Sequence, residues 1–112
     1  MNSLYSIITL FALGAIFGLY LLTLLLRKKE TPKLVTMIHG ALVALAFVLL
    51  IKYASQMGSG LLGTITFFSI AIVFGLTLIY RDLTGKSLPL WFAVCHGLLA
   101  VTGFILLVVY AF

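Results

Sequence analysis

Apolar residues form long uninterrupted stretches along this chain, and polar residues are confined to the short segments between them. An α-helix needs about 20 apolar residues to cross a bilayer. Four stretches meet that length, roughly Leu4–Leu26, Pro32–Tyr53, Leu61–Tyr80 and Leu88–Ala111. This pattern predicts an all-α membrane protein, a bundle of four transmembrane helices.

The composition strengthens this interpretation. Hydrophobic residues make up 64% of the 112 residues and charged residues only 8%. A soluble domain of this size could not bury so much apolar surface, whereas lipid solvates it. The net charge of +5 rests on few residues in short connections, which argues against nucleic acid as a partner. We expect a single membrane domain, residues 1–112, whose surroundings are the lipid bilayer.

The beginning of the chain and the helix starts carry further signals. Met1-Asn2-Ser3 lacks a basic segment and a cleavage site, so the first stretch is predicted to be a retained helix. Thr31 and Ser87 precede prolines, and their hydroxyls are predicted to cap the second and fourth helices. The single cysteine, Cys95, excludes an internal disulfide.

The basic residues predict the orientation. Lys52 is the one basic residue on its side of the predicted membrane, and six others lie in or beside the first and third connections: Arg27, Lys28, Lys29, Lys33, Arg81 and Lys86. Positively charged connections stay in the cytoplasm. Segments 27–31 and 81–87 are therefore predicted to be cytoplasmic and both termini outside, in a bacterial inner membrane.

The two halves of the chain resemble each other. A shift of 57 residues aligns them without a gap and gives 19 identities, including the uncommon pairs Pro32/Pro89 and His39/His96. We interpret this as two tandem repeats of two helices, about 1–55 and 58–112. Because each repeat has an even number of helices, the repeats are parallel, related by a pseudo-two-fold axis along the membrane normal.

His39 and His96 are the candidate functional residues. Each lies seven residues after its proline, about 10 Å into the membrane at a rise of 1.5 Å per residue. Ionisable residues at such depth are rare and mark functional sites. The two acidic residues, Glu30 and Asp82, are predicted to lie in loops.

Small residues surround the predicted histidine pair. Gly40 and Gly97 directly follow the histidines, and Gly18 and Gly75 fall at a similar depth in the partner helices. Gly14 and Gly18 form a GxxxG pattern, which lets helices approach closely. We therefore expect the histidines to face each other across a space bordered by glycine.

One haem b would suit that space. Haem iron accepts two axial imidazoles, and His39 and His96 are the predicted metal ligands. Gly18, Gly40, Gly75 and Gly97 would let the ring approach the backbone, and Lys33 and Lys86, with Lys29, would neutralise the propionates.

The pattern resembles the haem-binding four-helix core of membrane b-type cytochromes, including the cytochrome b561-like group. In that group, histidines on alternate helices hold haem and glycines on the others make room. The resemblance implies an electron-transfer protein. Its members usually carry two haems, one near each face, whereas the outer half of this chain has no second histidine pair.

Other functions stay open at this stage. A small-molecule or proton transporter is one alternative, and a structural membrane subunit whose histidines bind no metal is another. Cys95 directly precedes His96 and Met37 lies two positions before His39, so their side chains point about 100° and about 160° away around the helix, which argues against a copper site. The sequence does not choose between a quinol and a protein as redox partner, or between a homo- and a hetero-oligomer. Whether the chain is an enzyme is equally undecided.

Overall fold

The computed structural model of the protein describes residues 3–112, and these form helices and short connections without any strand. The elements are α1 (Ser3–Leu26), α2 (Lys33–Met57), the 3₁₀-helix η1 (Gly58–Leu61), α3 (Leu62–Leu83) and α4 (Leu90–Ala111). The all-helical prediction is confirmed for this part of the chain. Met1 and Asn2, on which the prediction of a retained N-terminus partly rests, lie outside the described residues.

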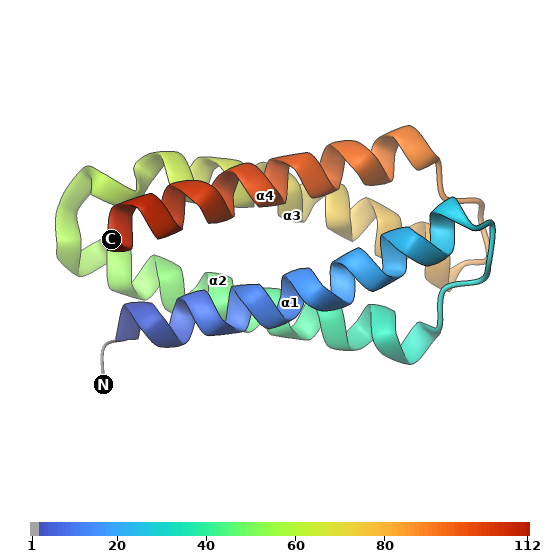
Figure 1. The fold of residues 1–112 in the computed structure, drawn as a ribbon, viewed down its shortest axis with the longest axis horizontal. Coiled ribbons are helices and arrows are strands. Elements are labelled where there is room, and N and C mark those ends of the chain that lie inside the picture. The colour runs from blue at the N-terminus through green and yellow to red at the C-terminus, as the bar shows by residue number, and fades with distance from the viewer. Residues whose placement is uncertain (1–2) are drawn as a thin grey trace.

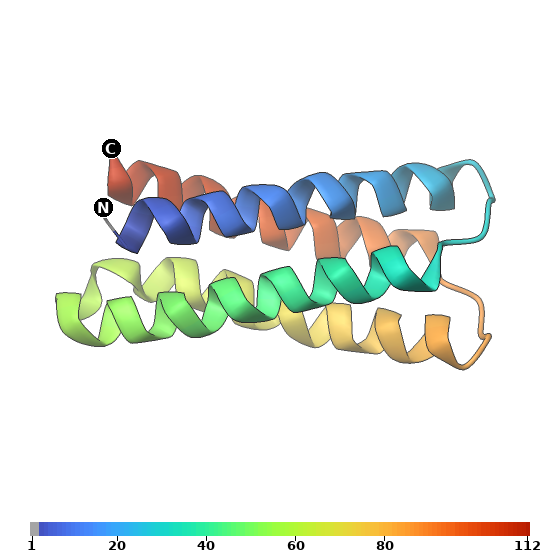
Figure 2. The same ribbon diagram turned by 90° about the horizontal axis from the view of Figure 1, so that it is seen from below.

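The helices form two antiparallel hairpins that pack side by side. α1 pairs with α2, and α3 pairs with α4 (Figure 1). The hairpins meet along α1 and α4 on one side and along α2 and α3 on the other (Figure 2). The start of α1, the end of α4 and η1 lie at one end, which we call the terminal end (Figure 1 and Figure 2). Segments 27–32 and 84–89 lie at the opposite end, the connection end.

Two predicted breaks prove to be partly helical. α2 continues past Tyr53 to Met57 and joins η1, so helical structure runs from Lys33 to Leu83. α3 continues through Arg81 and Asp82, which were expected in a loop. The physical reason is that neither segment contains proline, and the backbone hydrogen bonds of each helix can continue through polar residues.

Length and hydropathy permit the helices to cross a membrane. Within residues 3–112, three continuous helical stretches meet both criteria: Ser3–Leu26, Lys33–Leu83 and Leu90–Ala111. Large apolar side chains cover the outside, and Leu19 and Leu98, for example, are 65% and 62% exposed. Such a surface fits lipid and not water.

The predicted capping by Thr31 and Ser87 is wrong. Pro32 and Pro89 are themselves the N-cap residues, and no side-chain cap bond is present at either start in the described chain. The hydroxyls lie one and two positions too early to reach the first free N–H groups. Arg81 contacts the segment before α4 instead, donating from Nε to the carbonyl of Ser87 at 2.6 Å.

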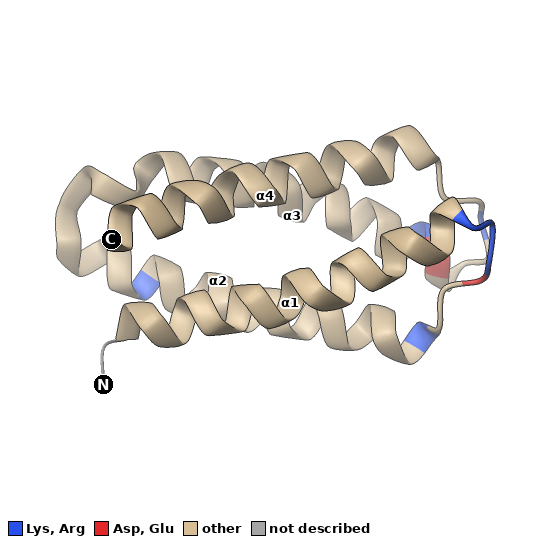
Figure 3. Ribbon diagram, viewed as in Figure 1, with Lys and Arg blue, Asp and Glu red and all other residues tan. Residues whose placement is uncertain are grey.

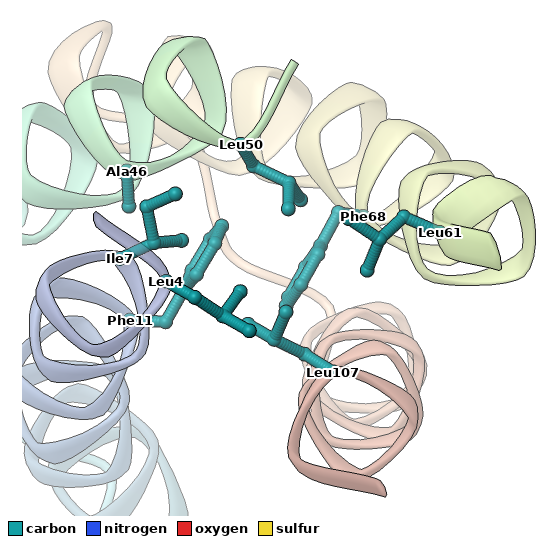
Figure 4. Packing of buried hydrophobic residues seen from close by; sticks show 8 residues of the cluster. All are labelled: Leu4, Ile7, Phe11, Ala46, Leu50, Leu61, Phe68 and Leu107. Atoms are coloured by element: carbon teal, nitrogen blue, oxygen red, sulfur yellow. The ribbon is translucent and has the colours of Figure 1, made fainter. Parts of the chain in front are cut away.

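The hydrophobic core is concentrated toward the terminal end. Phe11 of α1 and Phe68 of α3 stack there across the bundle (Figure 4). The cluster comes from all the long helices and η1: Leu4, Ile7, Phe11, Ala46, Leu50, Leu61, Phe68 and Leu107. The connection end contributes no residue to this cluster, and the two histidines lie in that half of the bundle.

Candidate functional site

His39 is held by a backbone carbonyl of the neighbouring helix. Its Nδ1 lies 2.7 Å from the carbonyl oxygen of Gly14 in α1. A carbonyl oxygen can only accept a hydrogen bond, so Nδ1 carries the proton and donates. In the neutral ring, Nε2 is then the unprotonated nitrogen and the one able to bind a metal.

His96 repeats this arrangement in the second hairpin. Its Nδ1 donates to the carbonyl oxygen of Ala71 in α3, also at 2.7 Å. Ala71 occupies the position that Gly14 holds in the first half of the chain. Both imidazoles are therefore fixed in the same tautomer by a partner in their own hairpin. These bonds hold α1 to α2 and α3 to α4, and do not join one hairpin to the other.

The two rings approach each other across the bundle. α2 packs against α1 and α3 but not against α4 in the part of the chain described, so the histidine-bearing helices stand diagonally. The ring centroids of His39 and His96 are 6.4 Å apart and the ring planes are 87° to each other. The fold thus brings together two residues that are 57 positions apart.

Gly18 and Gly75 each lie against a histidine ring. A Cβ added at Gly18 would lie 2.9 Å from Cε1 of His39, and one at Gly75 would lie 3.0 Å from Cε1 of His96. Real Cβ atoms essentially never approach as closely as at Gly18, so the His39 ring would have to move, and the contact at Gly75 is tighter than nearly all real ones, so the His96 ring would have to give way slightly. The two glycines make room for the imidazoles, whereas the sequence analysis expected them to make room for a haem ring.

The glycines that follow the histidines differ from each other. A Cβ at Gly40 would lie 3.2 Å from Cδ1 of Ile79 in α3, and Gly40 lines the cavity described below. Gly97 has no described neighbour within 4 Å of an added Cβ and does not line that cavity. The prediction that both glycines border one site therefore finds support at Gly40 only.

An apolar cavity adjoins the histidines. Its volume is about 320 Å³, within the range of about 300–1,000 Å³ that is usual for small-molecule sites. His39, His96, Gly18 and Gly75 all line it, together with Leu side chains of α1, Val, Ala and Phe side chains of α2, and Leu and Ile side chains of α3. Val48 of α2 and Leu76 of α3 belong to its lining and are also largely exposed, so the cavity opens sideways between these helices.

Asp82 lies in this cavity wall, which the sequence analysis did not predict. The residue is 8% exposed, and its carboxylate accepts hydrogen bonds from three residues of the α1–α2 connection and α2. Thr31 Oγ1 and Lys33 Nζ each donate to Oδ1 at 3.0 Å, and Thr36 Oγ1 donates to Oδ2 at 3.0 Å. A sequence signal existed, since Asp82 lies two helical turns after Gly75 on the same face.

The two predicted lysines both lie at the connection end, in different settings. Lys33 forms an ion pair with Asp82, at 3.0 Å, and also donates to the carbonyl oxygen of Asp82. Lys86 lies over the ring of Tyr80, with Nζ 5.2 Å from the ring centroid. Both residues line a second cavity of about 590 Å³, which shares Thr31, Asp82 and Leu88 with the apolar one. Charged residues gather visibly at this end (Figure 3).

Comparison with known proteins yields no match. No protein family, no curated protein and no solved structure is similar enough to this chain to support an assignment. The function must therefore be argued from the site itself.

Proposed function

We propose that this protein is an integral membrane b-type cytochrome that binds one haem between His39 and His96. The observation that carries the proposal is the pair of diagonal imidazoles, each with its Nδ1 bonded to a carbonyl and its Nε2 left unprotonated. A metal-binding histidine typically donates its other ring N–H to such a partner, which fixes the tautomer and the ring orientation.

The separation of the rings suits two ligands of one metal ion. Two metal–nitrogen bonds of about 2 Å, with roughly 1 Å from each nitrogen to its ring centre, give centroids about 6 Å apart. The observed separation of 6.4 Å agrees with this estimate.

The number of available ligands favours a metal that brings its own donors. The described residues contain no group of three or more His, Cys, Asp or Glu side chains able to hold a metal ion. Two imidazoles alone do not complete the tetrahedral or octahedral shell of a free ion. A haem supplies the remaining donors from its ring, and its iron undergoes reversible one-electron transfer.

The packing of the bundle also supports a large apolar ligand. Interiors are normally filled at high density, and the terminal end follows this rule with its stacked phenylalanines. The half that contains the histidines has a cavity lined mainly by Leu, Ile, Val and Gly instead. A flat apolar ring would fill it, with Lys33 and Lys86 near enough to the connection end to neutralise carboxylates there.

Two protein ligands leave the iron no open position, which favours electron transfer over oxygen binding.

We further propose four transmembrane helices, with α2 and α3 as separate spans. Their joint stretch of 51 residues would measure about 75 Å if straight, far more than the roughly 30 Å of a bilayer. The longest extent of the Cα trace is only 41 Å. The proposal retains two tandem repeats and a bacterial inner membrane, with the connection end in the cytoplasm.

An absorption spectrum tests the function. The protein is expressed with ample haem supply, purified in detergent, and recorded in oxidised and reduced form. We expect a Soret band and low-spin bands that sharpen on reduction. His39→Ala and His96→Ala should each abolish the low-spin spectrum, because each removes one of two axial bonds.

Cys95→Ser is the matched control, since Cys95 precedes His96 in the same helix but does not line the cavity. It should leave the spectrum unchanged. A native protein that purifies colourless would contradict the proposal, and so would haem that survives loss of both histidines. A colourless protein would favour a proton or small-molecule carrier.

A further inference from the structure

The second cavity, at the connection end, is lined mainly by polar and charged residues. Lys28, Lys29, Lys33 and Lys86 line it, against the two acidic residues Glu30 and Asp82. The cavity holds about 590 Å³ and lies where the apolar surfaces of the helices end. It therefore has a surplus of positive charge at the level of a membrane surface.

Two of the four lysines, Lys28 and Lys29, have neither an opposite charge nor an aromatic ring as partner among the described residues. Lys33 is paired with Asp82, and Lys86 lies over Tyr80. Among the residues that the structure describes, no carboxylate lies within ion-pair distance of Lys28 or Lys29. Two ammonium groups beside a cavity, without a counter-charge from the chain, favour binding of an anion.

The backbone at Lys28 adds an independent observation. Lys28 has φ of 56°, the left-handed region, and its N–H closes the end of α1 on the carbonyl of Leu25 at 3.1 Å. Gly85 holds the equivalent place after α3, with φ of 74°. A residue with a Cβ is strained in this region relative to glycine. The chain thus carries a cation where glycine would suit the backbone better.

The start of α2 supplies further donors. Pro32 and Lys33 line the cavity, and the first N–H groups of α2 receive no side-chain cap. Free N–H groups at a helix start favour phosphate.

We propose that this cavity binds the phosphate group of an anionic phospholipid through Lys28 and Lys29. Lipid phosphate groups are the anions present at the level of the membrane surface, and basic pockets at the ends of transmembrane helices bind such head groups. Lys28 has no role in the haem proposal, and Lys29 was only an additional partner for the propionates beside Lys33 and Lys86, so lipid binding through Lys28 does not depend on haem.

Lipid retention tests the proposal. The detergent-purified protein is incubated with phosphatidylglycerol or phosphatidylcholine, and bound lipid is measured by native mass spectrometry. Phosphatidylglycerol should be retained preferentially. Lys28→Gln/Lys29→Gln should lose this preference by about tenfold or more, as expected for two lysines near a phosphate.

The control removes the same amount of charge elsewhere. Arg27→Gln/Lys52→Gln changes one exposed residue beside the site and one at the far end of α2, neither of which lines the cavity. It should retain the preference. Equal retention of both lipids by the native protein, or equal loss in both double variants, would overturn the proposal.

A competition arm separates the two sources of phosphate. Inorganic phosphate in excess should not displace the lipid if the acyl chains contribute to binding. Displacement would assign the site to free phosphate, with the same lysines as ligands. Repeating the measurement with His39→Ala/His96→Ala separates this site from the haem proposal. This double variant should still retain phosphatidylglycerol although it binds no haem.

Discussion

Phe11 and Phe68 stack face to face across the middle of the bundle, with ring centroids 4.1 Å apart and planes 1° from parallel. They occupy equivalent positions in the two halves of the sequence. His39 and His96, the other equivalent pair that meets across the bundle, lie beside a cavity instead of a packed core. The phenylalanine pair thus belongs to the filled terminal half, and the histidine pair to the half that can receive a ligand.

The stacked pair gives a first prediction. Phe11→Ala and Phe68→Ala should each destabilise the protein by about 1–3 kcal/mol, less than in a soluble core because lipid solvates the unfolded side chain equally well. Their effects should not add, since each ring is the other's main contact. Unfolding in mixed micelles measures this, with the exposed Leu19→Ala as control. Strict additivity would contradict the stacked contact.

The glycines beside the histidines give a second prediction. Gly18→Ala and Gly75→Ala should reduce haem content. The added methyl carbons would lie 2.9 Å from Cε1 of His39 and 3.0 Å from Cε1 of His96, which is close enough to displace the imidazoles. Gly97→Ala is the matched control, since no described atom lies within 4 Å of its added Cβ. The ratio of Soret absorbance to protein measures the effect. Equal haem content in all three variants would argue against a site between these glycines and the histidines.

A third prediction concerns Asp82. Asp82→Asn should lower stability by about 1–3 kcal/mol, because the ion pair with Lys33 is lost and an amide nitrogen replaces one of the two accepting oxygens. Unfolding in mixed micelles again provides the measurement. Glu30→Gln should change little, since Glu30 is exposed and has no ion pair among the described residues. If both variants are equally stable, the cluster around Asp82 contributes nothing.

The proposed orientation gives a fourth prediction. In a Cys95→Ser background, a cysteine at Ser59 should react with a membrane-impermeant reagent from outside the cell, and one at Gly85 only from the cytoplasm. The reason is that six of the seven basic residues lie toward the connection end. Labelling in intact cells and in inverted vesicles distinguishes the sides. Reaction of Ser59→Cys from the cytoplasm would reverse the proposed topology.

Much of the fold could be predicted from the apolar pattern. The predicted and observed helix ends agree at Leu26 and Ala111, where the apolar stretch stops. They disagree at Tyr53 and Tyr80, where the helical backbone continues into polar residues. Polarity marks where a side chain prefers water. It does not stop a backbone that can still form its next hydrogen bond.

The candidate site was predictable in part. His39 and His96 were identified because ionisable residues stand out in an apolar helix, and Gly18 and Gly75 because their depth matches. Thr31 was assigned to a helix start and Asp82 to a loop, although their side chains bond to each other across 51 positions of sequence. No local pattern contains such a contact.

The sequence by itself determined that these segments are helical and apolar, because a backbone in lipid must satisfy its hydrogen bonds within its own helix. It also determined which rare residues stand within them. The tertiary structure alone decided that both histidines bond to carbonyls of neighbouring helices, that Gly97 faces open space, and that Asp82 is buried among Thr31, Lys33 and Thr36. These features depend on how neighbouring helices are rotated and spaced, and that is fixed by contacts between side chains far apart in the chain.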